Sequence, residues 1–267
     1  DSQTISANAT YDAITVNGDL TVAPNVTLTC TSLTVANDIG AGNTATLIVG
    51  DGGKVVVSGS SATKIGVGQG RAEVYLGRGA RFEAAKYLYF NYGFSSDPAS
   101  DAAMTEAYLY AGTNSVVQCE DFQFGYNSKK PSGTANSAVK SIVRLDKGVM
   151  LRAYRIRDRS PVSKTIEFNG GYFDQRSSAY DAGIVRMDYE AKNSTLLLSG
   201  IGDNPVVFKL SDIQRDAATF ASFGSKSEYL KIEGAGGFTK RGGGFCPIVT
   251  ADTSWEDAQN RPNLKIL

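Results

Sequence analysis

One phrase recurs along the chain: a short run of alternating apolar residues, a glycine-rich turn and a second apolar run. It is clearest near the C-terminal end, where Leu230 and Ile232 precede the run from Gly234 to Gly237 and Phe238 follows it. Alternation with a period of two places Leu230 and Ile232 on one face of a strand. Glycine permits positive φ angles, so the run between the strands predicts a tight corner.

Six earlier stretches repeat the phrase at uneven intervals. The glycines that mark the predicted turns are Gly52, Gly79, Gly112, Gly148, Gly170, Gly200 and Gly234. Successive markers are 27, 33, 36, 22, 30 and 34 residues apart. Repeats of this length are typical of solenoids, propellers and arrays. The blades of a propeller have similar lengths, so the uneven spacing favours a β-solenoid whose outer loops vary.

The stretch from Ile232 to Gly244 reads IEGAGGFTKRGGG. It resembles the glycine-rich strand repeat of bacterial autotransporter passengers and related surface proteins. The chain departs from that repeat after Gly244, where Phe245-Cys246-Pro247 stands in place of an apolar strand. The resemblance implies an all-β, right-handed parallel β-helix displayed outside a bacterial cell, often for adhesion or host contact. We therefore expect a secreted or cell-surface protein whose signal peptide has been removed.

We expect a single domain over residues 1–267. Regular N-terminal coils are predicted over residues 1–90, coils with loop insertions over 91–228, and the last coil with a C-terminal cap over 229–267. The insertions are expected at residues 95–104 and 127–137, on successive coils. Residues 211–227 carry apolar side chains at spacings of three and four, which predicts a short helix.

The composition excludes several kinds of site. Histidine is absent, which removes Ser-His-Asp and Cys-His catalysis and imidazole zinc sites. Lys and Arg number 27, as do Asp and Glu, so no basic excess favours nucleic acid. Cys30, Cys119 and Cys246 lack metal-binding spacing, and we expect Cys30 to be buried in the interior. We therefore expect a monomer with no metal, cofactor, nucleic-acid partner or membrane insertion.

Aromatic residues gather beside the two predicted insertions. Tyr89 and Tyr92 precede the first insertion, and Tyr126 precedes the second. Exposed tyrosines in these positions can stack on the apolar face of a pyranose ring, which makes them candidate glycan-binding residues. The alternative is that alternate aromatic rings fill the interior while the tyrosine hydroxyls reach solvent.

Three arginines alternate in the run LRAYRIRDR. In an extended strand Arg155, Arg157 and Arg159 share one face. They are candidates for a groove that binds acidic glycans, such as sialylated or sulfated mucin chains. Alternatively, they pair with carboxylates on the next coil, about 4.8 Å away.

Four aspartates fall on successive strand-and-turn units: Asp146, Asp158, Asp174 and Asp188. Two of them, brought together on one face, would suit glycoside hydrolysis or an aspartic peptidase. The alternative is that they balance the arginines.

Three hypotheses follow. The preferred one is a secreted or cell-surface protein that binds host glycan or mucin. The second is an aspartate-dependent hydrolase of mucin glycan or peptide, and the third is a structural stalk.

Overall fold

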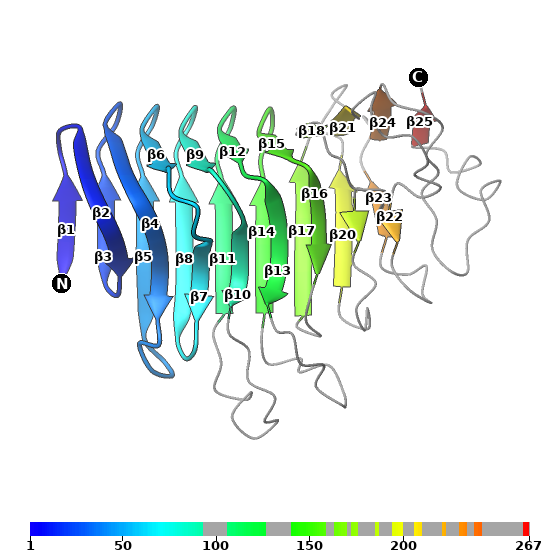
Figure 1. The fold of residues 1–267 in the computed structure, drawn as a ribbon. Coiled ribbons are helices and arrows are strands. Elements are labelled where there is room, and N and C mark those ends of the chain that lie inside the picture. Colours follow the sequence, from blue (N-terminus) through cyan, green and yellow to red (C-terminus); the bar gives the residue numbers. More distant parts are fainter. Residues whose placement is uncertain are drawn as a thin grey trace.

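The computed structural model of the protein is all-β with parallel strands. It describes residues 1–92, 106–126, 140–158, 163–169, 172–175, 185–186, 194–199, 206–209, 221–222, 230–233, 238–241 and 264–266. Twenty-five strands run through these residues, with no helix among them. Figure 1 shows the strands lying side by side along one axis, from β1 near the N-terminus to β25 near the C-terminus.

Sheet A takes one strand from each repeat of the chain. Its order is β1 (Ser2–Ile5), β3 (Asp19–Val22), β5 (Thr44–Val49), β8 (Arg71–Leu76), β11 (Glu106–Ala111), β14 (Lys140–Leu145), β17 (Ser163–Asn169), β20 (Ser194–Ser199) and β23 (Leu230–Glu233). All of these neighbours pair in parallel.

Sheet B has two arms that meet at the long strand β4 (Thr27–Asn37), with which β2 (Ala9–Val16) also pairs. Residues 27–30 of β4 pair with the first arm and residues 34–37 with the second. The first arm contains β6 (Lys54–Val57), β9 (Arg81–Ala84), β12 (Val116–Gln118), β15 (Met150–Ala153), β18 (Tyr172–Gln175), β21 (Val206–Lys209), β24 (Phe238–Arg241) and β25 (Leu264–Ile266). The second arm contains β7 (Thr63–Val67), β10 (Leu88–Tyr92), β13 (Asp121–Tyr126), β16 (Arg155–Asp158), β19 (Val185–Arg186) and β22 (Ala221–Ser222).

From β5 to β24 the chain visits sheet A, the first arm and the second arm in turn, and we call one such passage a rung. Leu47, Val74, Leu109 and Val143 are register partners on successive strands of sheet A, so these rungs are 27, 35 and 34 residues long. The predicted insertions follow β10 and β13, which are paired neighbours. The insertions themselves lie outside the described residues.

A column of residues in the left-handed conformation joins sheet A to the first arm. These residues, which we call the turn column, are Asn25, Gly52, Gly79, Asn114 and Gly148, with φ of 61°, 66°, 69°, 59° and 73°. Each is the third residue of a turn that a backbone hydrogen bond closes, as from Val149 N to Asp146 O (3.0 Å). Positive φ at the third residue is typical of a type II turn, where Gly and Asn are favoured.

The sequence markers find four of these five turns and misplace one of the four, while the turn at Asn25 carries no marker. The marker glycine Gly112 is the first residue of its turn, and Asn114 takes the left-handed position instead. Asparagine tolerates this conformation because its short polar side chain can bond locally. Backbone hydrogen bonds also join the turns of neighbouring rungs, as from Asn114 N to Lys147 O (3.0 Å).

The interior is filled by alternate side chains from both sheets, as the period of two predicts. An aromatic group lies in the second arm, where the ring centroid of Phe90 is 4.9 Å from that of Phe122 and 5.6 Å from that of Phe124. Cys30 is a buried free thiol, as expected, and burial raises its pKa to about 11. A thiol with so high a pKa is almost wholly protonated at neutral pH and therefore unreactive.

The strands predicted on either side of Gly234–Gly237 are present as β23 in sheet A and β24 in sheet B. The helix predicted over residues 211–227 falls outside the described residues, except for β22, which is a strand. Within the described part of the chain, no helix has the length and apolar character that crossing a membrane requires.

Candidate functional site

The predicted tyrosines lie on two neighbouring strands of the second arm. Tyr89 belongs to β10 and is only 4% exposed, while Tyr92 is partly exposed. The ammonium of Lys64 lies 4.3 Å from the ring centroid of Tyr92, a cation–π contact. Tyr126 is the register partner of Tyr92, and its side chain lies outside what the structure describes. Neither alternative describes Tyr89: it is not exposed, and it lies outside the interior cluster that holds Leu88 and Phe90, with its ring centroid 5.3 Å from that of Tyr92.

Arg155 is buried in an ion pair. Its Nε lies 3.1 Å from Oδ1 of Asp121, and its Nη2 lies 3.0 Å from Oδ2. The side chains of Arg155 and Asp121 are 10% and 1% exposed. This is the predicted pairing between neighbouring strands, at a bidentate geometry. Arg157 is the register partner of Gln123, while its side chain and all of Arg159 lie outside the described part.

The aspartates take different positions in the repeat. Asp146 is exposed in the turn after β14, Asp158 ends β16 in the second arm, and Asp174 lies in the first arm. The carboxylate of Asp174 accepts a hydrogen bond from Nε of Arg152 at 2.9 Å, so it balances an arginine other than Arg155, Arg157 and Arg159. Asp188 lies outside the described residues. The described aspartates do not line up in one column, because a turn and two different arms supply them.

A different cluster emerges on the outer face of sheet A. The outward side chains of β5, β8, β11, β14 and β17 form three columns across the strands, and we call this surface the tyrosine face. One column runs through Ile48, Tyr75, Tyr110, Arg144 and Glu167, and a second through Thr46, Glu73, Tyr108, Ile142 and Thr165. A third runs through Thr44, Arg71 and Glu106, and Lys140 begins the next strand, β14.

Two of the most exposed large hydrophobic side chains of the described residues are adjacent here. Ile48 is 40% exposed and its register partner Tyr75 is 36% exposed. On the other side of Tyr75, the ring of Tyr110 stacks at 5.1 Å between centroids with 22° between planes. One ring face of Tyr75 is thus covered by Tyr110, and Ile48 is the register partner of Tyr75 on the opposite side.

Arg71 connects the charged groups of the tyrosine face. Its Nε donates to Glu73 and its Nη1 to Glu106 at 3.3 Å, while its guanidinium carbon lies 4.1 Å from the ring centroid of Tyr108. Burial acts to lower the pKa of Arg71, but the hydrogen bond and charge of Glu73 outweigh it and the pKa is raised. Arg71 is therefore a fixed cation between two carboxylates.

Two tyrosine hydroxyls complete this network. The hydroxyl of Tyr75 donates to Glu73 at 2.9 Å, and that of Tyr108 donates to Glu106 at 2.7 Å. Burial and the hydrogen bond to Glu73 raise the pKa of Tyr75 to about 12. Burial, followed by the hydrogen bond to Glu106, also raises the pKa of Tyr108. Both hydroxyls stay protonated at neutral pH and act as donors.

Arg144 closes the face on its far side. Its Nε donates to Glu167 at 2.6 Å, and its guanidinium carbon lies 5.7 Å from the ring centroid of Tyr110. The hydrogen bond with Glu167 and the charge of that carboxylate raise the pKa of Arg144 against the effect of burial. The tyrosine face thus offers aromatic surface, aliphatic surface and paired hydrogen-bonding groups on one flat sheet.

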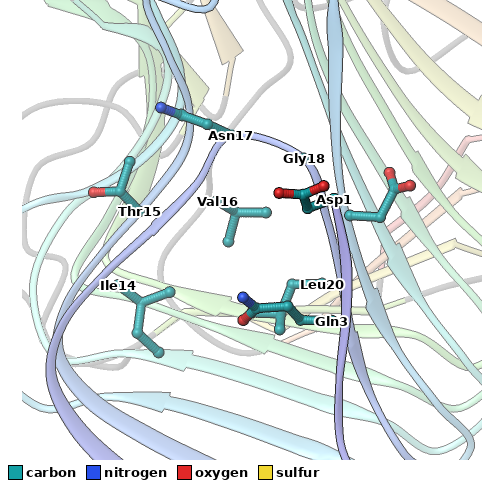
Figure 2. Close-up of a pocket in the computed structure, with 9 residues that line it drawn as sticks. Asp1, Gln3, Ile14, Thr15, Val16, Asn17, Gly18 and Leu20 are labelled. Carbon is teal, nitrogen blue, oxygen red and sulfur yellow. The ribbon is translucent and has the colours of Figure 1, made fainter.

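A cavity of about 300 Å³ lies at the N-terminal end of the molecule. Figure 2 shows Ile14, Val16 and Leu20 in it, with the polar side chains of Gln3 and Asn17 nearby. Val16 and Leu20 also belong to the hydrophobic interior, so the cavity is the end of that interior. No group of three or more metal-ligating side chains occurs among the residues that the structure describes. The tyrosine face is therefore the stronger candidate.

Comparisons with known proteins add no name to this site, because no family model, curated protein or solved structure matches the chain.

Sequence reasoning did not single out Arg71, Glu73, Tyr75, Tyr108 or Tyr110 as a site. Each strand carries the necessary signal, because polar and aromatic residues alternate with apolar ones in RAEVYL and EAYLYA. The missing information was the register, which places Tyr75 beside Tyr110 across a step of 35 residues.

Proposed function

We propose that the chain is a right-handed parallel β-helix displayed outside a bacterial cell, where it binds host glycan on the tyrosine face. The rungs support the β-helix, since successive strands alternate among three parallel ladders and recur every 27 to 35 residues in the first part of the chain. Solenoid repeats present extended surfaces of this kind for binding.

The single observation that carries the binding proposal is the exposed pair Ile48 and Tyr75 beside the stacked Tyr110. A sugar ring has apolar C–H surface on its faces and hydroxyls around its edge. The exposed surfaces of Ile48 and Tyr75 match the apolar surface. The hydroxyls can exchange hydrogen bonds with the flanking Glu73 and Arg71, since a hydroxyl both donates and accepts.

This proposal moves the binding site away from Tyr89 and Arg155, whose side chains are buried. Tyr92, Tyr126 and Arg157 remain candidates for a secondary contact on the second arm. Arg159 lies outside the described residues and remains a prediction. No described contact favours the hydrolase built on Asp146, Asp158, Asp174 and Asp188, because Asp174 is engaged by Arg152 and the others lie elsewhere in the repeat or outside the described residues.

The test is retention of the purified protein on immobilised mucin. We expect the variant Tyr75→Ala to lose about tenfold in affinity, which corresponds to about 1.4 kcal/mol. The matched control is Tyr11→Ala, because Tyr11 is 46% exposed in β2 of sheet B, away from the tyrosine face. Equal retention of both variants and the unchanged protein would reject the site, and absence of any retention would favour the stalk.

A further inference from the structure

The charges on the tyrosine face cancel one another. From β5 to β17 its outward cations are Arg71, Lys140 and Arg144, and its outward carboxylates are Glu73, Glu106 and Glu167. Neither arginine is available as a lone cation, since Arg71 is shared by Glu73 and Glu106, and Arg144 is held by Glu167.

This balance decides which ligands the face can take. An acidic sugar bound at Ile48 and Tyr75 would have to displace a carboxylate from Arg71 and would then lie beside that displaced negative charge, because the exposed cation Lys140 lies on β14, two strands from Tyr75 on β8. Like charges in such proximity are destabilising, and the arginine would gain nothing by exchanging one carboxylate for another. A neutral hydroxyl requires no displacement, because it can donate to a carboxylate oxygen and accept from a guanidinium at the edge of the pair.

The aromatic and aliphatic groups point to the same ligand class. Ile48 and Tyr75 are partly exposed side chains without formal charge, and the charged pairs lie beside them on the same strands and the next ones. An uncharged sugar can place its C–H surface on Ile48 and Tyr75 while its hydroxyls reach Glu73 and Arg71.

We infer that the tyrosine face selects neutral glycans, with Glu73, Glu106 and Glu167 excluding sialylated and sulfated ones. This inference rests on the proposed function, since it specifies the ligand of the same site. It differs from the acidic-glycan groove that the arginine run suggests from sequence.

The experiment compares binding of the protein to neutral oligosaccharides with binding to their sialylated and sulfated forms. We expect neutral forms to bind at least tenfold more tightly, and enzymatic removal of sialic acid from mucin to leave retention unchanged or increase it. Binding should change little with salt, because no net charge is neutralised. The reverse preference, with retention lost after removal of sialic acid, would overturn the inference while leaving glycan binding intact.

Two variants separate this inference from the proposed function itself. Glu167→Gln frees Arg144 and gives the face a positive charge, so we expect it to gain affinity for sulfated glycans that the unchanged protein lacks. Tyr75→Ala should lose neutral glycans without gaining acidic ones. No gain in Glu167→Gln would contradict the charge argument. Absence of binding to every glycan, neutral or acidic, would instead reject the proposed function.

Discussion

At the scale of single residues, the turn column shows how backbone conformation restricts side chains. Gly79 and Gly148 both have positive φ, at 69° and 73°. They differ in their surroundings: a Cβ added at Gly79 would meet nothing within 4 Å, whereas one at Gly148 would collide with Oδ1 of Asn114 on the preceding rung. The two positions therefore separate the cost of the conformation from the cost of crowding.

We expect Gly79→Ala to lower the free energy of unfolding by about 1 kcal/mol, the cost of the left-handed conformation for a residue with Cβ. Gly148→Ala should cost clearly more, about 2–3 kcal/mol, because the Asn114 side chain must also move. Chemical denaturation measures both. If Asn114 is the cause of the extra loss, Asn114→Gly in the Gly148→Ala background should recover it. Equal losses in Gly79→Ala and Gly148→Ala would instead show that the Asn114 side chain moves aside freely.

The hydroxyl of Tyr75 gives a second residue-level prediction. Its pKa is raised from 10.0 to about 12 by burial and by Glu73. Between these pH values the unfolded chain releases the proton while the folded chain keeps it, so stability is lost as pH rises from about 10 to about 12. Tyrosinate formation can be followed by ultraviolet titration of the unchanged protein and of Tyr75→Phe. The transition that Tyr75→Phe lacks should lie near pH 12.

Glu73→Gln is the control for that titration. It removes the negative charge beside the Tyr75 hydroxyl, so the transition should move toward the ordinary value of tyrosine, about 10. A Tyr75 transition already near 10 in the unchanged protein would contradict the hydrogen bond to Glu73.

At the scale of strands, the sequence predicts much of the fold and little of the site. Alternation of apolar residues in segments such as DLTV and TATLIV predicts the strands and their inward faces, and glycine marks most of the corners. The alternation fails in β10, where Leu88, Tyr89, Phe90 and Asn91 are all buried. The sequence of β10, LYFNY, alternates between apolar and polar-tipped side chains, so it predicts an exposed Tyr89. The strand is buried on both sides, and its sequence does not reveal that.

The site escaped prediction for a different reason. A pair such as Tyr75 and Tyr110 depends on which residues of successive rungs are partners, and the rungs differ by up to eight residues in length. The pattern within one strand does not contain that alignment. Burial of the Arg155–Asp121 pair likewise depends on what surrounds the second arm, which local sequence does not reveal.

Two ion pairs of contrasting exposure give a prediction at this scale. Asp121→Asn should destabilise the protein by about 3–5 kcal/mol, because it removes the carboxylate charge that is paired with the buried Arg155. Glu167→Gln breaks a pair whose arginine is 48% exposed, and it should cost about 1 kcal/mol or less. Thermal and denaturant unfolding of the two variants measures the difference. Similar losses would mean that Arg155 reaches solvent.

At the scale of the whole molecule, each rung pairs mainly with the rungs directly before and after it. Leu47 of β5 and Val74 of β8 are register partners 27 residues apart, so residues 48–74 amount to one complete repeat. Removing them joins Leu47 to Tyr75, which takes the place of Ile48, and leaves every later residue on its original face.

We expect the protein lacking residues 48–74 to fold and to unfold cooperatively. The matched control lacks residues 48–73, a difference of one residue. It places Val74 outward and Tyr75 inward, because a slip of one residue moves each side chain of a strand to the opposite face. Circular dichroism and limited proteolysis compare the two, and equal behaviour of both deletions would contradict the rung as the unit of the fold.

The turn column affects how the number of rungs can change in evolution. Each left-handed turn is hydrogen-bonded to its neighbours through backbone atoms, which any side-chain sequence supplies. An in-frame gene duplication that copies one rung therefore inserts a segment whose ends already match the adjoining segments. The outward columns remain aligned across the inserted copy. Each duplication would therefore lengthen the tyrosine face by one strand spacing, about 4.8 Å, and would leave the outward side chains of the other strands in place.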